Sequence, residues 1–332
     1  MKLLITGGTG FIGSRLALKL RGEGRDVVVA GQVNNDAERA RLAELEAAGV
    51  QLVPGPLQDS AYARQVSAGC DAVVHLAAAQ HEANVPDAYF ETVNVEGTRT
   101  LIEASVAAGV GRFVYGSTIG VYGEASEGVL TEQSPPQPAN IYGRTKLAAE
   151  GVVRSYAAKL PVSIVRISET YGPGDFRLLK LFKAIDRGRF FMIGAGLNRR
   201  QVIHVDDLIA VLLGAVQHPA AVGETFVAAG AEIMTTRDMV ERIAVALGRP
   251  GPRLQVPLWP FLMLAIAMET ALKPVGIQPP LHRRRLDFFR KSFVFDTRKV
   301  RDVLGITPAV AFPQGAAESA AWYRAHGYLA PG

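Results

Sequence analysis

Short apolar runs alternate with amphipathic stretches along the first half of the chain. The apolar runs have the length of buried strands and cover residues 2–6, 26–30, 51–54, 71–76, 112–115 and 162–167. Apolar residues recur at helical spacing in the intervening segments 11–21, 60–67, 88–108 and 142–159. Strands that alternate with helices predict an α/β fold, in which one doubly wound parallel sheet is covered by helices on both faces.

The pattern changes after Gly172, where the elements become shorter. Residues 235–247 are predicted to form an amphipathic helix that ends at Gly248, and residues 314–326 another. A chain of 332 residues is too long for one small core. We expect a sheet domain made of residues 1–170 and about 198–228. A smaller C-terminal α/β lobe would hold residues of about 171–197 and 229–332.

The most apolar stretch of the chain runs from Val256 to Met268 and is followed by Glu269. It is too short to cross a bilayer, which takes about 20 apolar residues. Three interpretations stay open: a buried helix lining an apolar pocket, a helix facing a partner, or a segment resting on a membrane surface. The run Arg283–Arg285 lies soon after, and apolar plus basic residues are typical of an interfacial segment. A solvated basic face beside a core helix has the same pattern.

Composition and charge narrow the class of protein. Cys70 is the only cysteine, which excludes a disulfide framework and fits a reducing compartment. The first residues lack the apolar core and cleavage site of a signal peptide, so we expect a cytoplasmic protein. The net charge of +5 would suit a polyanion, but the arginines are scattered and no nucleic-acid motif accompanies them. We expect an anionic cofactor and no nucleic-acid partner.

A glycine-rich turn follows the first predicted strand and leads into a helix, and it reads Gly7-Gly8-Thr9-Gly10-Phe11-Ile12-Gly13. Gly7 allows a tight turn, Gly10 lets the backbone approach a pyrophosphate, and Gly13 lets the helix pack closely on the strand. The helix N-terminus offers backbone amides to the phosphates. This context predicts a Rossmann-type dinucleotide-binding domain, which leaves the C-terminal lobe to bind the substrate.

The end of the second strand should contact the adenosine ribose. An acidic residue there would bind the 2′-hydroxyl of NAD, and a basic one would bind the 2′-phosphate of NADP. The sequence runs into Gly31-Gln32-Val33-Asn34-Asn35, which offers neither. Arg39 and Arg41 follow on the next helix and are either solvated or within reach of a phosphate. The choice between NAD and NADP is open at this point.

Tyr142 and Lys146 are four residues apart in a predicted helix, so their side chains lie on one face. A nearby ammonium favours the phenolate form of a tyrosine. The pair can therefore act as general acid and base for a secondary alcohol or ketone.

The chain resembles the extended short-chain dehydrogenase/reductases, which include nucleotide-sugar epimerases, dehydratases and 3β-hydroxysteroid dehydrogenases. Besides the glycine turn, the resemblance rests on His75-Leu76-Ala77-Ala78, Asn94-Val95-Glu96-Gly97-Thr98, Gly116-Ser117-Thr118 leading to Val121-Tyr122-Gly123, Tyr142 with Lys146, Tyr171-Gly172-Pro173-Gly174-Asp175 and His204-Val205-Asp206-Asp207. The apolar segment at 256–268 looks more like the 3β-hydroxysteroid dehydrogenase branch than the galactose epimerases. A homodimer built on residues 97–108 and 142–159 is a family-level expectation.

The resemblance implies a role for each matching residue. Thr118 would hydrogen-bond the substrate oxygen, Tyr142 would exchange the proton, and Lys146 would hold the nicotinamide ribose. Ser117 is the neighbouring candidate for the hydroxyl role, and Asn94 would brace the catalytic elements. His75 and His204 are interpreted as structural, and no metal site is expected. The residues expected to contact the cofactor are Gly7, Gly10, Phe11, Ile12, Gly13, Gln32, Leu57, Leu76, Ala77, Ala78, Asn94, Ser117, Tyr142, Lys146 and Ser168.

Three positions bear on adenine and substrate binding. Many members of the superfamily have an aspartate where this chain has Pro56, so adenine contact must rest on other groups. Sugar-nucleotide epimerases usually have an asparagine in the segment that here reads Ser168-Glu169-Thr170. A carboxylate at Glu169 would repel a diphosphate unless it is protonated or turned away. Arg200 does match an epimerase position that contacts the diphosphate.

The leading hypothesis is an NAD(P)-dependent oxidoreductase that transfers a hydride between nicotinamide and a secondary alcohol or ketone. Its substrate would be apolar, steroid-like or a β-hydroxy or keto compound. The alternative is an NAD-dependent nucleotide-sugar epimerase or dehydratase. An alternative of another class is a non-catalytic dinucleotide-binding sensor, because fold alone does not give function.

Overall fold

A computed structural model describes residues 1–80, 85–123, 128–252, 254–272, 281 and 283–330. Its central feature is a seven-stranded parallel sheet in the order β11-β6-β5-β4-β1-β2-β3. The strands are β1 (Lys2–Thr6), β2 (Asp26–Gly31), β3 (Gln51–Pro54), β4 (Ala72–His75), β5 (Arg112–Thr118), β6 (Val162–Ile167) and β11 (Thr225–Ala228). This sheet confirms the predicted fold class.

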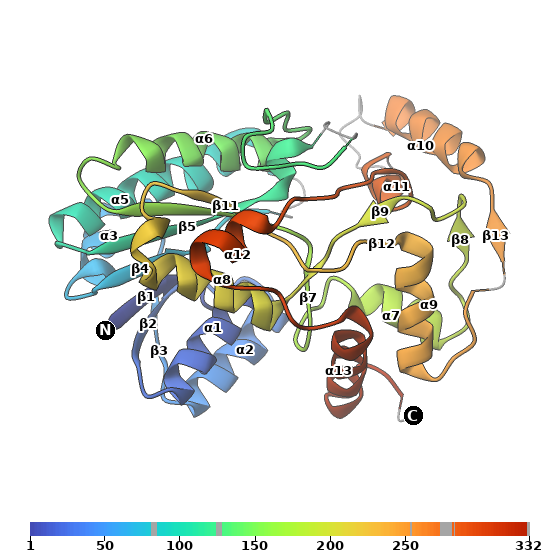
Figure 1. Ribbon diagram of the computed structural model, residues 1–332, viewed down its shortest axis with the longest axis horizontal. Coiled ribbons are helices and arrows are strands. Elements are labelled where there is room, and N and C mark those ends of the chain that lie inside the picture. The colour runs from blue at the N-terminus through green and yellow to red at the C-terminus, as the bar shows by residue number, and fades with distance from the viewer. Residues whose placement is uncertain (81–84, 124–127, 253, 273–280, 282, 331–332) are drawn as a thin grey trace.

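Helices cover both faces of the sheet (Figure 1). One face carries α1 (Phe11–Gly22), α2 (Asp36–Ala47) and α8 (Val205–Gln217), and the other carries α3 (Ser60–Ser67), α5 (Gly97–Ala107) and α6 (Ile141–Ser155). A short helix, α4 (Asp87–Glu91), and a π-helical turn (Thr92–Glu96) precede α5. Short 3-10 turns lie at Ile119–Tyr122 and Pro219–Ala221. The strand order reverses between β1 and β4, which is where ligands bind in such sheets.

Smaller elements lie beyond the carboxyl ends of the strands (Figure 1). They are β7 (Thr170–Tyr171), α7 (Leu179–Asp186), β8 (Met192–Ile193), β9 (Arg199–Arg200), β10 (Ile203–His204), β12 (Met234–Thr235), α9 (Thr236–Leu247), β13 (Gln255–Val256), α10 (Leu258–Leu272), α11 (Arg283–Arg290) and α13 (Phe312–Ala325). A further helix, α12 (Arg298–Leu304), packs on α8 and β11. The residue bounds of the two predicted domains stay a prediction.

The ends of α9 and α6 show how nearby residues determine where a helix begins or stops. Thr235 caps α9 in a capping box with Asp238, and Gly248 ends the helix with a φ of 69°. Helix α6 stops at Ser155, earlier than the predicted Lys159, and turns follow. A residue that precedes proline disfavours helical angles, so the chain must leave the helix before Pro161.

Gly13→Ala should disturb the glycine turn. An added Cβ would lie 2.4 Å from the carbonyl oxygen of Gly7, so backbone must move. We expect a loss of about 1–3 kcal/mol in the free energy of unfolding, together with weaker NAD binding.

Gly151→Ala is the matched control for that substitution. Gly151 lies inside α6, and an added Cβ would meet no atom within 4 Å. We expect this change to stabilise the protein by about 0.5–1 kcal/mol in urea denaturation. Equal effects of the two substitutions on stability would contradict the close approach at Gly13.

Candidate active site

The glycine turn forms a cradle at the carboxyl end of β1. Gly7 adopts a φ of 67°, and an added Cβ there would lie 2.7 Å from the backbone nitrogen of Ala77. Gly10 caps α1 without any side-chain hydrogen bond, so Phe11 and Ile12 begin the helix with backbone amides facing outward from the turn. A side chain would fill this space. The cradle therefore suits an anion that approaches the backbone itself.

Most of the other predicted cofactor contacts follow the carboxyl ends of the sheet strands. Leu76, Ala77 and Ala78 follow β4 and are half-buried, with Ala77 next to Gly7. Leu57 is buried and belongs to the core cluster under α3 and α5. Ser168 follows β6, and its hydroxyl donates to the Gln201 carbonyl at 2.6 Å. These side chains shape the rim, and their contact with a cofactor stays a prediction.

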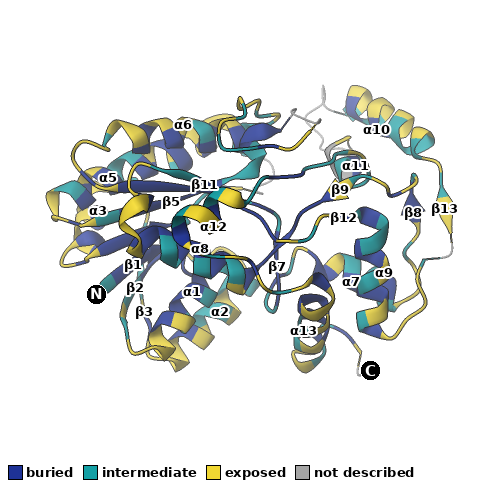
Figure 2. Ribbon diagram, viewed as in Figure 1, coloured by how far each residue is buried: buried dark blue, intermediate teal, exposed yellow. Residues whose placement is uncertain are grey.

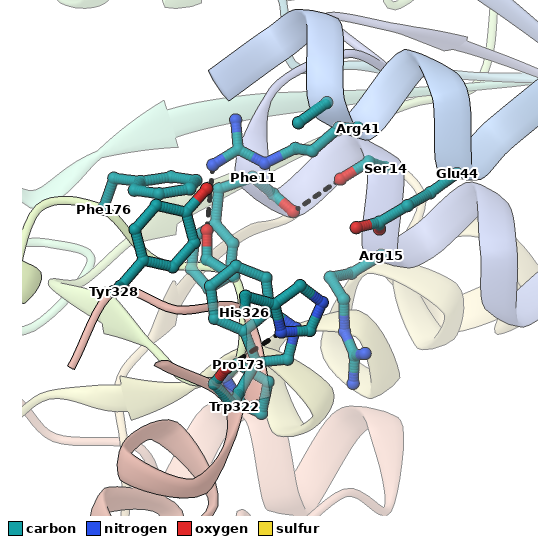
Figure 3. Close-up of a pocket in the computed structure, with 12 residues that line it drawn as sticks. Phe11, Ser14, Arg15, Arg41, Glu44, Pro173, Phe176, Trp322, His326 and Tyr328 are labelled. Atoms are coloured by element: carbon teal, nitrogen blue, oxygen red, sulfur yellow. Dashed lines mark hydrogen bonds between the residues drawn. The ribbon is translucent and has the colours of Figure 1, made fainter. Parts of the chain in front are cut away.

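The end of β2 presents Gln32 to solvent. Thr9 fixes this segment, because its hydroxyl donates to the Gln32 carbonyl oxygen at 2.9 Å. Arg41, one of the two arginines considered for a 2′-phosphate, is directed elsewhere (Figure 3). It donates to the Gly174 carbonyl at 2.9 Å, and its guanidinium lies 5.2 Å from the centre of the Phe176 ring.

Arg41 thus ties α2 to the C-terminal lobe across a small cavity. The cavity is lined by residues of α1 and α2 on one side, and by Phe176, Trp322 and Tyr328 on the other (Figure 3). Burial lowers the pKa of the Arg41 guanidinium, although nearby carboxylates oppose the shift. Arg39 is exposed and lies 3.9 Å from Asp36.

Tyr142 and Lys146 lie on the first turns of α6. Asn140 caps this helix by accepting a hydrogen bond from the Gly143 amide at 3.0 Å. Lys146 is buried, and its ammonium lies 4.1 Å from the centre of the Tyr115 ring. Burial lowers the pKa of Lys146 to about 7, while the charge of Glu150 opposes this shift. A lysine of this kind can change protonation near neutral pH, and Tyr142 is half-buried on the same face.

The two neighbouring hydroxyls at the end of β5 have different partners. Ser117 is buried and donates to the Glu150 carboxylate at 2.6 Å. Thr118 is half-buried and accepts a hydrogen bond from the Gly120 amide at 3.0 Å, which leaves its own proton available to a ligand. Of the two candidates, Thr118 is the hydroxyl that can donate into the site.

A buried ion pair that was not predicted from the sequence lies one helical turn beyond Lys146. Glu150 accepts from Arg166 at 2.9 and 2.8 Å, and from Arg154 at 2.8 Å. Burial alone would raise the pKa of Glu150, but hydrogen bonds and charge from Arg166 outweigh it and lower the pKa. The spacing of residues 142, 146 and 150 on one helix face was the available signal.

Asn94 and His75 brace the elements around the site. Asn94 lies in the π-helical turn, accepts from the Ala79 amide at 2.7 Å and donates to the Thr145 hydroxyl at 3.0 Å. This joins the segment after β4 to the helix that carries Tyr142. His75 lies between the hydroxyls of Thr6 and Thr98, at 2.6 and 2.9 Å.

The two histidines near strand ends are both buried. Burial, and secondarily the charge of Lys146, lowers the pKa of His75 to about 3, so its ring is neutral near neutral pH. His204 caps α8 and stacks edge-to-face on Tyr171, with ring centres 5.3 Å apart. Within the described ranges, no cluster of three or more His, Cys, Asp or Glu residues could hold a metal ion.

Glu169 and Arg200 form an ion pair close to the ends of β6 and β9. Arg200 is buried, donates to the Thr236 hydroxyl and the Phe288 carbonyl, and lies 4.0 Å from the centre of the Phe288 ring. Burial would raise the pKa of Glu169, but the charges of Arg200 and Arg177 lower it on balance. Glu169 is therefore ionised near neutral pH and turned toward Arg200.

Known proteins that are similar to this chain include enzymes that bind NAD, as the glycine cradle predicts. The profile of the NAD dependent epimerase/dehydratase family matches residues 3–229. The chain belongs to this family. A dTDP-glucose 4,6-dehydratase from Streptomyces niveus is 31% identical over 344 residues, which cover 98% of this chain and 93% of that relative.

Solved structures resemble this family member along its whole length. DesIV, a dTDP-glucose 4,6-dehydratase from Streptomyces venezuelae with NAD and TYD bound, has a TM-score of 0.79 and 29% identity, covering 100% of this chain and 99% of its own. A UDP-glucuronic acid 4-epimerase from Bacillus cereus, in complex with NAD, has a TM-score of 0.80 at 23% identity, covering 98% and 99%. The second likeness concerns the fold alone.

The chain is thus an NAD-dependent enzyme of the short-chain dehydrogenase/reductase superfamily. The relatives compared are nucleotide-sugar dehydratases and epimerases, and they do not single out the 3β-hydroxysteroid dehydrogenase branch that residues 256–268 indicated. The residues fit NAD, because the glycine cradle suits a pyrophosphate and Arg41, one of the two arginines considered for a 2′-phosphate, is held by the Gly174 carbonyl.

Lys146→Met should alter how stability depends on pH. Burial lowers the pKa of Lys146 to about 7 in the folded protein, whereas a lysine in the unfolded chain has a pKa of about 10.4. Between these values the unfolded state binds more protons, so the cost of burying the ammonium falls as pH rises. We expect the nucleotide-free variant to be more stable than wild type below pH 7.

That difference should shrink toward pH 10, as measured by urea denaturation across this range. Lys180→Met, at an exposed position of α7, controls for the loss of an ammonium and should change stability by less than about 0.5 kcal/mol. A difference between Lys146→Met and wild type that stays constant with pH would contradict the burial argument.

Proposed function

We propose that this chain acts on a nucleotide-linked sugar, transiently oxidising one carbinol carbon and returning the hydride, as an epimerase does. The observation that carries the substrate class is likeness to nucleotide-sugar enzymes over nearly the whole chain, including the C-terminal lobe. The lobe is the part that should choose the substrate. The arrangement of Thr118, Tyr142 and Lys146 supports the redox step.

NAD, when bound, supplies a hydride acceptor and donor. Tyr142 takes the proton of the carbinol oxygen as the carbon loses its hydride, and it gives the proton back when the hydride returns to the other face of the sugar. Lys146 lies one turn away on α6, and its charge favours the phenolate. The Thr118 hydroxyl donates to the same oxygen and stabilises negative charge that develops on it.

The residues next to Thr118 favour epimerisation over dehydration. Loss of water needs an acid to protonate the departing hydroxyl and a base for the adjacent C–H proton. The three residues directly after Thr118 are Ile119, Gly120 and Val121, which cannot titrate. The hydroxyl of Tyr122, the next residue, donates to the Thr131 carbonyl at 2.8 Å. Glu169 follows β6, the strand that pairs with β5. Its pairing with Arg200 keeps it ionised, so it cannot donate a proton near neutral pH.

A second candidate function is net oxidation or reduction of an apolar alcohol or ketone. The ion pair of Glu169 with Arg200 favours this second function, because the carboxylate already pairs with the buried guanidinium and would repel a diphosphate. The two candidates differ in cofactor turnover. An epimerase converts UDP- or dTDP-sugars with no net change in nicotinamide absorbance, whereas a dehydrogenase accumulates NADH or consumes it.

Tyr142→Phe should remove turnover and leave NAD binding intact. The phenol is the proposed proton carrier, so kcat for sugar-nucleotide epimerisation should fall about 10²–10⁴-fold, measured by chromatography of the product. Tyr156→Phe is the matched control at the opposite end of the same helix, where the phenol donates to Glu103 at 2.6 Å, and it should retain activity. Unchanged turnover in Tyr142→Phe would refute the catalytic role of Tyr142, whereas a wild-type protein that binds NAD without any turnover would be a dinucleotide sensor.

Glu169→Gln should improve binding of a sugar nucleotide. Without the carboxylate, Arg200 is free to meet the diphosphate, so KM for the sugar nucleotide should fall about tenfold while kcat changes little. Glu224→Gln serves as control, because its ion pair with Lys299 lies at the amino end of β11, away from the site. A higher KM in Glu169→Gln would contradict a diphosphate contact at Arg200.

A further inference from the structure

The helix α10 is apolar on all sides and yet lies at the surface. Glu269 is its only charged residue, and no helix among the described residues has both the length and the apolar character needed to cross a bilayer. A helix that is apolar all round is normally buried in a core or in lipid. Here Trp259 is 69% exposed, Met263 59% and Leu264 52%. The segment is therefore not the buried core helix considered from the sequence, as Figure 2 shows.

The inner side of α10 is firmly attached to the lobe. Ala265 and Leu286 are buried together, with Phe261 and Leu262 packed against them. The helix's only charge is neutralised, because Glu269 pairs with Arg283 at 3.0 Å. The outer side therefore presents apolar groups and no ionised side chain of its own.

Neighbouring residues extend this apolar surface. Leu254 is 60% exposed just before β13, and β13 pairs with β8 in a short parallel ladder. Phe191, partly exposed, precedes β8, and its ring centre lies 6.2 Å from that of Phe261. We call the exposed set Phe191, Leu254, Trp259, Met263, Leu264 and Ile266 the α10 surface.

Cations lie next to the α10 surface, and the nearby carboxylates are paired. Arg187 and Arg189 are exposed and directly precede the aromatic pair that ends in Phe191. The Arg283 side chain is 59% exposed at the start of α11. On the acidic side, Asp186 pairs with Arg249, and Asp287 pairs with Arg290 and Lys291.

We propose that the α10 surface docks on a bilayer containing anionic phospholipids. Exposed apolar side chains beside arginines match the acyl and headgroup layers of such a membrane, and tryptophan favours that interface. The fifteen residues of α10 would span about 22 Å, less than the roughly 30 Å hydrocarbon core, so the helix lies along the surface.

A second copy of the chain fits this surface less well. A two-fold contact over α10 would bring Arg187, Arg189 and Arg283 of both copies together, and like charges oppose association. The dimer expected from the sequence would use α5 and α6, which lie at the other end of the molecule (Figure 1). That contact would leave α10 uncovered.

Vesicle sedimentation of the full chain tests the proposal. Wild type should pellet with phosphatidylcholine vesicles that contain phosphatidylglycerol, less with phosphatidylcholine alone, and less at high salt. Met263→Gln with Leu264→Gln should weaken binding more than about tenfold. Arg187→Gln with Arg189→Gln should weaken binding to the anionic vesicles about fivefold per arginine.

Val245→Gln is the matched control, since Val245 is 78% exposed on α9 in the same lobe, and it should bind vesicles as wild type does. Failure of wild type to pellet with anionic vesicles, or equal binding by all variants, overturns the proposal. A lipid-free dimer that the Met263→Gln and Leu264→Gln variant dissociates in sedimentation velocity would assign the surface to a second copy and overturn it too. None of these outcomes depends on the sugar-nucleotide proposal.

Discussion

The buried carboxylate of Glu150 fixes the relative positions of the elements that carry the candidate active site. It lies on α6 and accepts hydrogen bonds from Ser117 at the end of β5 and from Arg166 on β6. Thr118 follows Ser117 in β5, and Lys146 precedes Glu150 by one turn of α6. The Glu150 carboxylate therefore fixes the position of the Thr118 hydroxyl relative to the face of α6 that carries Lys146. Removing one partner of a buried ion pair typically costs about 3–5 kcal/mol, so the arrangement is held tightly.

Much of this architecture could be predicted from short-range patterns. Alternating strands and helices indicate the parallel sheet, and the capping residues of α9 indicate where that helix begins. Helical spacing placed Tyr142 and Lys146 on one face. The same reasoning, carried one turn further, reaches Glu150. Alternation along β5 places Tyr115 and Ser117 on one side of the strand, where Lys146 and Glu150 lie, so it separates Ser117 from Thr118.

Contacts between distant segments could not be predicted in this way. Arg41 was a candidate for a 2′-phosphate, but its carbonyl partner at Gly174 lies 133 residues along the chain. The pairing of Glu169 with Arg200 likewise joins residues 31 positions apart, next to the segments that the pairing of β7 with β10 brings together. The exposure of α10 is a similar case, because a helix that is apolar all round has no polar stripe to show which side faces solvent.

The substrate side of the lobe and the α10 surface are joined by one short helix. Phe288 of α11 holds Arg200 through its carbonyl and its ring, and Leu286, two residues earlier, packs against α10. Close-packed interiors transmit displacement between neighbours, so a shift of α10 must be accommodated between these two residues. Helix α11 is therefore the element that contacts both α10 and Arg200, the cation paired with Glu169.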